Sequence, residues 1–326
     1  MIATINGGIS RFTGRRRRRQ VLGLLAAFLL FMQPIFPFAL PGARAEPEEL
    51  SGSGTELDPY KIFTAEDLDK VRNDLNAHYV LESDIDLSNW GDWEPIGWHG
   101  SFFHYFNGHF DGNGHTISNL TVSIENDAGL FGYIGNTGVV QNLELSNVNV
   151  VSKNDPGGSA GALTGVLYGS AINIRVTGGT ITGDNNAGGL AGLSNNGAVI
   201  EGSCTGAAVS GAMSAGGLVG YMMDTEVKES CATGAVSGGS FAGGLAGLVE
   251  DSAFIDSYAT GTVDGGSLAA AGGLIGMVSF LQLHATDLTR VYASGKVKGS
   301  VLNAGSLVGQ TSGMLNLNDA YYDKDR

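Results

Sequence analysis

The chain has 326 residues, with 52 glycines, seven prolines, two cysteines and a formal net charge of −14. A chain this acidic repels nucleic acid and anionic lipid, so neither is an expected partner. Its glycines come with few prolines and with periodic apolar positions, which excludes a low-complexity, disordered chain.

The first 45 residues have the pattern of a secretion signal. Five arginines over Arg15–Arg19 precede an apolar run over Val21–Met32, and Ala43-Arg44-Ala45 has the A-x-A form of a cleavage site. We therefore expect residues 1–45 to direct export, by the general or the twin-arginine route. An uncleaved anchor over residues 21–40 is the alternative, although two prolines weaken that helix.

Removal of this segment would make the remaining chain more acidic. The segment holds seven basic residues and no acidic one, which leaves 11 of the 18 basic residues against 32 acidic ones and a net charge of −21. No later stretch is apolar for long enough to cross a membrane. We expect a secreted or cell-surface protein without membrane contact after signal cleavage.

A short tag that contains Leu and closes on Gly recurs along the chain. Its closing glycines are 33, 27, 28, 27, 29 and 33 residues apart. A period of this length is typical of repeat architectures, in which each unit buries its apolar face against its neighbours. The seven copies are Gly129–Gly132, Gly161–Gly165, Gly189–Gly192, Gly217–Gly220, Gly244–Gly247, Gly273–Gly276 and Ser306–Gly309.

A second recurring segment of similar length follows about ten residues after each of four tags. It is a short β-type run punctuated by Gly, and no room for a helix remains between the pieces. The pattern predicts an all-β fold, a right-handed parallel β-helix (β-solenoid) of roughly eight to ten coils. A leucine-rich repeat is excluded because each unit carries one fixed Leu. The four runs are Ser203–Gly211, Ser230–Gly238, Ser257–Gly265 and Val291–Gly299.

In such a fold each residue lies over its equivalent in the next coil, one strand spacing of about 4.8 Å away. We therefore expect two files of stacked apolar side chains inside the solenoid. The Leu file comprises Leu190, Leu218, Leu245, Leu274 and Leu307, and the Val file comprises Val209, Val236, Val263 and Val297.

The stretch before the repeats predicts a cap. Residues 46–57 resemble a linker, residues 58–127 an N-terminal cap with the first coils, and residues 128–326 the repeat solenoid with an incomplete last coil. Thr64 can N-cap a helix with Asp67 three residues later. Leu68, Val71 and Leu75 then share one face, so we expect one short capping helix.

Short strands should follow this helix. Tyr79–Leu81 and Ile85–Leu87 are strand-like, and Phe110–Ile117 has the pattern of a strand, a Gly-Asn-Gly turn and a second strand.

Together these motifs resemble the GLUG family, named for its Gly-Leu-x-Gly tag. The repeats match over residues 128–322, and Pro59–Ile62, Ile85–Leu87 and Phe110–Ile117 resemble the segment that often precedes them. The resemblance implies a bacterial secreted or surface protein, adhesin-like in some members. The family also includes non-catalytic regions of zinc metallopeptidases that cleave immunoglobulin A. Their His-Glu-x-x-His motif is missing from this sequence, so protease activity does not carry over.

Four histidines, His99, His104, His109 and His115, lie close together among aromatic residues. Zinc would need three or four of them to converge, and strand geometry scatters them over both faces. We expect structural roles, with zinc bound by His99, His104 and His109 as the alternative. The aromatic residues predict packing of the cap first and a carbohydrate platform second.

Cys204 and Cys231 are 27 residues apart at the same repeat position. A disulfide between adjacent coils fits the permitted Cα separation. Because Tyr258 and Tyr292 fill the same position in later coils, we expect two thiols instead.

Four polar residues, each four positions past a tag, predict a turn column: Asn136, Asn196, Asp224 and Asp251. Calcium bridging Asp224 and Asp251 with Glu250 is the alternative, since calcium favours carboxylate oxygens. We otherwise expect no cofactor. An acidic strip with Lys228 as base would suit a polysaccharide lyase, but nothing in the sequence pairs Lys228 with the acids.

No residue set predicts catalysis, so we expect a non-catalytic scaffold with an adhesion or binding role. Its partners would be an extracellular glycan or a matrix or host protein. A polysaccharide lyase or glycoside hydrolase on the same fold is the alternative, since fold alone does not determine function. The incomplete C-terminal coil leads to two alternative expectations, that the chain is a fragment of a larger protein or that this end associates with the end of another copy.

Overall fold

The computed structural model describes residues 49–97, 104–153, 157–266, 269–279, 284–300 and 303–323. The chain divides into a unit that ends at Glu49 and a unit over Leu50–Arg326, and the second unit is described here. The predicted signal segment and His99 lie outside the described residues.

The second unit begins with β1 (Tyr60–Ile62), which is followed by the one α-helix of the described residues, α1 (Ala65–Asp69), and this helix tightens into the 3₁₀ turn η1 (Lys70–Asn73). The Thr64 hydroxyl accepts a hydrogen bond from the Asp67 N–H at 3.1 Å, as the capping pattern predicts. Leu68 and Val71 are fully buried. The predicted short N-terminal helix is confirmed.

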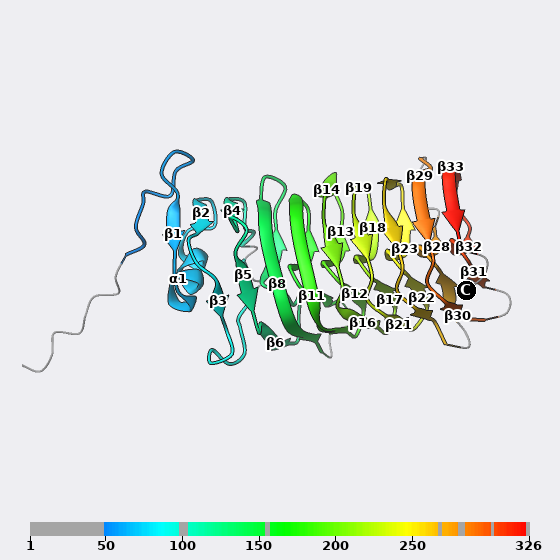
Figure 1. The fold of residues 1–326 in the computed structure, drawn as a ribbon, viewed down its shortest axis with the longest axis horizontal. Helices are drawn as coiled ribbons and strands as arrows, with labels where there is room; N and C mark the ends of the chain where they lie inside the picture. The colour runs from blue at the N-terminus through cyan, green and yellow to red at the C-terminus, as the bar shows by residue number, and fades with distance from the viewer. Residues whose placement is uncertain are drawn as a thin grey trace, which may run out of the picture. The chain divides into compact units, whose positions relative to one another are not determined.

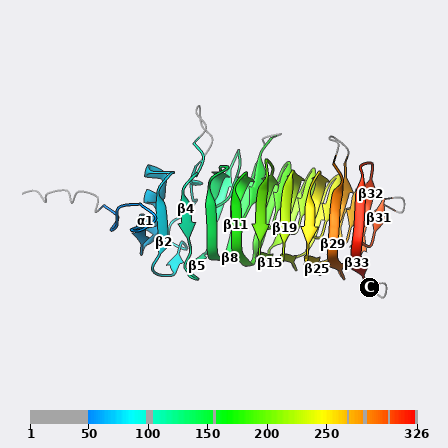
Figure 2. The same ribbon diagram turned by 90° about the horizontal axis from the view of Figure 1, so that it is seen from above.

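From this end onward the chain winds into stacked coils whose strands all pair in parallel (Figures 1 and 2). The coils form three sheets, and strands of successive coils lie side by side. The predicted all-β parallel solenoid is therefore confirmed.

The 20-stranded sheet contains three columns that merge where strands are long. The first column is β1, β2 (His78–Leu81), β4 (His109–Asp111), β8 (Val139–Ser152), β11 (Ser170–Gly183), β14 (Ala198–Glu201), β19 (Thr225–Lys228), β24 (Ala253–Ile255), β29 (Thr286–Ala293) and β33 (Leu315–Tyr322). The second adds β3 (Ile85–Asp86), β5 (Thr116–Ser118), β15 (Cys204–Thr205), β20 (Cys231–Ala232) and β25 (Tyr258–Ala259). The third adds β6 (Thr121–Ile124), β16 (Ala208–Gly211), β21 (Val236–Gly238), β26 (Val263–Asp264) and β30 (Val297–Lys298).

The tags lie between the other two sheets. The seven-stranded sheet consists of β7 (Phe131–Ile134), β10 (Thr164–Leu167), β13 (Ala191–Ser194), β18 (Val219–Met223), β23 (Ala246–Glu250), β28 (Ile275–Val278) and β32 (Val308–Thr311). The six-stranded sheet consists of β9 (Ser159–Gly161), β12 (Asn186–Gly188), β17 (Ser214–Gly216), β22 (Phe241–Gly243), β27 (Ala270–Gly272) and β31 (Ala304–Gly305).

The core follows the period of the repeat. Leu218 donates its N–H to the Leu245 carbonyl at 2.9 Å, and both side chains are fully buried. Val209 pairs with Val236, and Val236 pairs with Val263. At the far end Leu307 and Val297 are only partly buried, because few coils cover them.

The first Gly of a tag permits close approach of two coils. A Cβ on Gly244 would collide with the Gly273 carbonyl oxygen of the next coil. Gly244 therefore stands beside Leu245 because only a residue without a side chain fits between these two coils.

Candidate functional site

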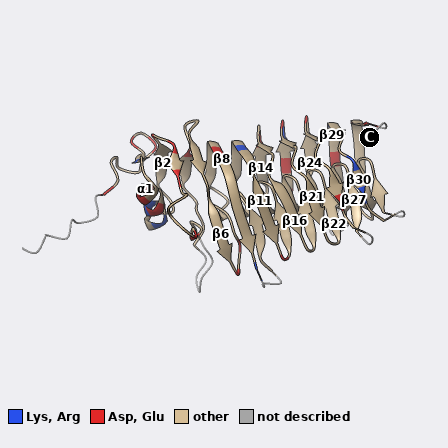
Figure 3. Cartoon of the chain, turned by 60° about the horizontal axis from the view of Figure 1, so that its bottom comes forward, with Lys and Arg blue, Asp and Glu red and all other residues tan. Residues whose placement is uncertain are grey.

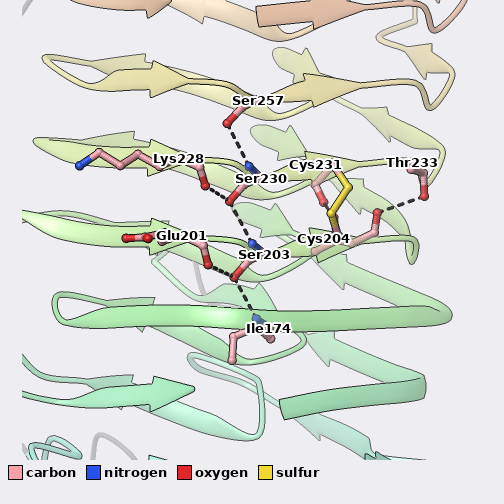
Figure 4. The surroundings of a disulfide bond; sticks show 11 residues. Ile174, Glu201, Ser203, Cys204, Lys228, Ser230, Cys231, Thr233 and Ser257 are labelled. Carbon is pink, nitrogen blue, oxygen red and sulfur yellow. Dashed lines mark hydrogen bonds between the residues drawn. A yellow bond between two sulfur atoms is a disulfide. The ribbon is translucent and has the colours of Figure 1, made fainter. Parts of the chain in front are cut away.

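Cys204 and Cys231 form a disulfide between adjacent coils, with their Cα atoms 4.5 Å apart (Figure 4). The expectation of two thiols is therefore wrong. The two residues are direct partners of β15 and β20, and this register brings their sulfur atoms together. Tyr258 and Tyr292 occupy the same register position in the later coils.

A file of buried serines lies next to this disulfide (Figure 4). The Ser230 hydroxyl accepts the Ser203 N–H at 3.1 Å and donates to the Lys228 carbonyl at 2.6 Å. Ser257 repeats the arrangement one coil later, at 3.2 Å from the Ser230 N–H. Each hydroxyl thus satisfies a backbone N–H at a corner where the strand hydrogen bonds are interrupted.

The three described histidines of the predicted cluster, His104, His109 and His115, are not brought together. His104 is exposed in a loop, and His109 lies in β4 with its ring stacked on His78, the centroids 5.5 Å apart. His115 contacts Asp84 through Nδ1 at 3.0 Å. Over the described ranges, no group of three or more His, Cys, Asp or Glu side chains could hold a metal ion.

The acidic turn residues divide between two environments. Asp224 and Asp251 adopt left-handed φ angles of 45° and 44°, the corner role that the turn column predicts, and they line a hollow of about 360 Å³ with Asp287. Asn196 shares this conformation, whereas Asn136 does not.

Glu250 is not part of that hollow. It is 2% exposed, its carboxylate accepts hydrogen bonds from the Tyr221 and Ser279 side chains, and its Oε2 atom has no partner in the described part of the chain. Burial raises the pKa of Glu250. Burial of the Tyr221 hydroxyl, together with the neighbouring Glu250 carboxyl, raises the pKa of Tyr221 to about 12. The structure therefore does not bring Asp224, Asp251 and Glu250 together as a calcium site.

Lys228, the candidate base nearest to the acids in the sequence, forms an ion pair with Glu226 on its own strand. The hydrogen bond that Lys228 donates to Glu226 raises the pKa of Lys228. A lysine base needs the opposite shift to act near neutral pH.

Three tyrosines in register form a surface file that continues from the disulfide. Tyr258 pairs with Cys231, Tyr292 with Tyr258, and Tyr321 with Tyr292. Their exposed fractions are 42%, 40% and 62%. Figure 3 shows few acidic or basic residues along the middle of the solenoid, but near the tyrosines Asp256 and Arg290 form an ion pair, two residues before Tyr258 and Tyr292. We call these three residues the tyrosine file.

Two files of asparagines, which the sequence analysis did not single out, follow the corners of the early coils. In the first amide file, Asn147 donates to Asn119 and Asn119 donates to Asp86, each at 2.7 Å. These asparagines have left-handed φ angles of 52° and 61°. The hydrogen bond from Asn119 lowers the pKa of Asp86.

The second amide file has the same order. Asn173 donates to Asn142 at 3.2 Å, and Asn142 donates to Asp111 at 3.1 Å. Burial alone would raise the pKa of Asp111, but hydrogen bonds, led by that from Gln141, outweigh it and lower the pKa. In both files a chain of amide-to-amide hydrogen bonds thus ends at a carboxylate whose pKa is lowered.

No protein-family model matches the chain, so the GLUG resemblance stays a prediction. Over 164 residues the chain is 39% identical to halomucin of Haloquadratum walsbyi. The aligned region covers 47% of this chain and 2% of halomucin. Over 170 residues it is 36% identical to a Gly-rich protein of Evansella cellulosilytica that is named as a membrane protein, covering 49% of this chain and 19% of that one. The chain thus spans a small part of each relative. No helix in the described ranges is long and apolar enough to cross a membrane.

Two solved structures share the fold. One is assigned as an immunoglobulin A1 protease from Bacteroides ovatus, with a TM-score of 0.67, 22% identity and coverage of 83% of this chain and 86% of that one. The other is named IgA1 protease, with a TM-score of 0.60, 21% identity and coverage of 80% and 21%. At these identities the likeness concerns the β-solenoid and not the activity.

Proposed function

We propose that this chain is a non-catalytic scaffold, secreted or displayed at the cell surface, that binds an extracellular glycan or matrix protein. The tyrosine file carries this proposal. Rigid aromatic side chains on a fixed backbone supply contact area at low conformational cost, and the file presents three of them one strand spacing apart.

Location outside the cell is supported by two independent observations. The first 45 residues have the composition of an export signal, and the relatives are named a halomucin and a membrane protein. The ion pair of Lys228 with Glu226 argues against the base that a lyase would need.

Binding should be measured on an array of glycans and matrix proteins. Tyr258→Thr/Tyr292→Thr removes both rings and replaces them with β-branched residues that suit a strand. We expect at least a tenfold loss of affinity for the ligand that the unchanged protein captures. Ser210→Ala, an exposed change in β16, is the control and should bind normally.

Equal binding by the double tyrosine variant would remove the tyrosine file from the proposal. Incubation of the protein with polyuronates and neutral glycans tests the non-catalytic part. Release of unsaturated chain ends would show a lyase instead.

A further inference from the structure

A groove of about 550 Å³ lies beside the first amide file in the early coils. Its polar lining consists of Ser88, Asp92, Asn119, Thr121, Asn147 and Asn149. This volume falls in the range of small-molecule sites, roughly 300–1,000 Å³. We call it the amide groove.

The groove exists because one coil lacks a strand. β6 pairs with β8 on one side, but on the other side the chain after β3 makes a loop over residues 87–92 in place of a strand. Trp93 fixes this loop, since its N–H donates to the Thr121 carbonyl at 2.7 Å and its Nε1–H donates to the Leu130 carbonyl at 3.1 Å. Trp93 is 1% exposed, so the wall of the groove is rigid.

The first amide file ends inside this groove with an open acceptor. Asn147 uses Nδ2 to donate to Asn119, which fixes the orientation of its amide. By register the next coil places Gly178 at this position, and the space where its Cβ would stand is open. The Asn147 Oδ1 atom therefore faces no donor from the described chain and is held ready for one from a ligand.

The other polar groups complement this acceptor. Asn149 pairs with Thr121 in register and accepts from the Thr180 hydroxyl through Oδ1 at 3.2 Å, which leaves both Nδ2 donors open. The exposed Asp92 carboxylate makes no hydrogen bond or ion pair to any described residue. The groove is thus lined by two open acceptors, on Asp92 and Asn147, and by the open Nδ2 group of Asn149, and all three can pair with the hydroxyl groups of a sugar.

The charge of the groove selects among sugars. Asp92 lines it, Asp86 lies at the head of the amide file, and no Lys or Arg is among its lining residues. A uronate, sulfate or phosphate group bound in the groove would be repelled by these carboxylates. Leu87 and Gly91 complete the lining and offer an apolar contact for the C–H face of a ring.

We propose that the amide groove is a binding subsite for a neutral hexose unit of an oligosaccharide, with Asp92 and Asn147 accepting from adjacent hydroxyls and Asn149 donating. The proposal rests on the binding role proposed above and assigns it a second site with a ligand class. The groove and the tyrosine file involve different residues, so the two can fail separately.

The second amide file supplies a matched control. Its last member, Asn173, has the same left-handed backbone as Asn147, with φ of 54°. Gly202 follows it in the next coil, but there the missing Cβ position lies against Asn173 Oδ1, so this end is closed. Asn173 lines no part of the amide groove.

The test titrates the protein with maltotetraose, cellotetraose, mannotetraose and galactotetraose, and follows the side-chain amide signals of Asn147 and Asn149 by NMR. At least one neutral tetraose should shift both signals, and tetragalacturonate should shift neither. Asn147→Gly deletes the amide at a position where glycine suits the backbone, and Asp92→Asn deletes the charge. Each should weaken binding at least tenfold, measured by calorimetry, while Asn173→Gly binds normally.

Thermal melting of every variant checks that it folds. Absence of a shift with all four neutral sugars would overturn the proposal, as would stronger binding of tetragalacturonate. Sugar binding that survives both Asn147→Gly and Asp92→Asn would place the subsite elsewhere and leave the scaffold proposal intact, because the tyrosine variants judge that proposal.

Discussion

Leu218 shows what a single residue contributes to this fold. Its side chain is fully buried between Leu190 and Leu245 of the neighbouring coils. A coil cannot move sideways to fill a gap because its backbone is hydrogen-bonded above and below. The cavity left by a truncation should therefore persist.

Leu218→Ala should lower the free energy of unfolding by about 2–5 kcal/mol, the range for buried leucines whose site does not collapse. Leu307→Ala, at the same file position but only partly buried, should cost clearly less. Urea unfolding followed by circular dichroism measures both. Equal effects would show that the Leu file is not the core.

Glu250 makes the stability of the folded chain depend on pH. Its pKa is raised in the fold, so the folded chain holds this proton more tightly than the unfolded chain. Its contribution to stability is therefore present below the unfolded pKa, near 4.5, and is lost as pH rises through the folded pKa.

Glu250→Gln keeps an acceptor for Tyr221 and removes the buried charge. Its melting temperature should exceed that of the unchanged protein at pH 7–8, and the difference should shrink toward pH 4. The exposed Glu201→Gln is the control and should not show this pH-dependent gain. A Glu250→Gln variant that is less stable at pH 8 would contradict the raised pKa.

At the scale of the strands, the disulfide joins β15 to β20 and closes 27 residues, one coil. In the chain-entropy model, closing a loop of this length lowers the entropy of the unfolded state and thereby raises its free energy by about 3–4 kcal/mol. The adjacent serine file already fixes the register of these two coils, so the bond does not create the register.

Cys204→Ser/Cys231→Ser should therefore fold with the same circular dichroism spectrum and lose about 2–4 kcal/mol of unfolding free energy. Reducing agent should lower the stability of the unchanged protein to that of the variant and leave the variant unaffected. A reduced protein that melts with its stability unchanged would show that the two cysteines are not joined in solution.

The period of the tags was enough to predict the parallel coils, because a residue such as Leu218 recurs wherever the backbone returns. The capping helix was predicted from a local signal, the Thr64 cap and the apolar face that follows it. The disulfide was missed because Tyr258 at the same position indicated simple packing, and sequence spacing does not distinguish two thiols from a bond. The amide files begin at Asn119 and Asn142, 28 and 31 residues before Asn147 and Asn173, outside the tags. The recurring asparagines themselves were a signal in the sequence, because Asn is one of the few residues that adopt the left-handed conformation at a corner.

The amide groove could not be predicted for a different reason. It depends on the loop over residues 87–92, which replaces a strand and breaks the period, and on Trp93 anchoring that loop to the next coil. A repeat pattern predicts what recurs, whereas this site arises where the pattern fails.

For the molecule as a whole, each coil contacts only the coils on either side, so the number of coils is adjustable while the register is not. Deletion of residues 166–192 removes one 27-residue unit and joins Gly165 to Leu193. The junction keeps the native sequence pattern, because Leu193 also follows a glycine, Gly192, in the native chain. We expect this protein to retain the β-sheet spectrum and a single cooperative transition. Circular dichroism and thermal melting test it.

Deletion of residues 167–192, one residue fewer, is the matched control. The extra residue reverses the inward and outward faces at the junction of the coils. This variant should lose cooperativity or solubility. Similar behaviour of the two deletions would contradict the strict register of the solenoid.

The bond between Cys204 and Cys231 also matters when the protein is pulled. Tension applied at the two ends would unspool coils one after another and lengthen the tether. The 27-residue segment inside the cross-link cannot extend, which withholds about 90 Å of contour length at 3.3–3.6 Å per residue. A chain anchored between a cell and a surface would thus stretch less in oxidising surroundings than in reducing ones.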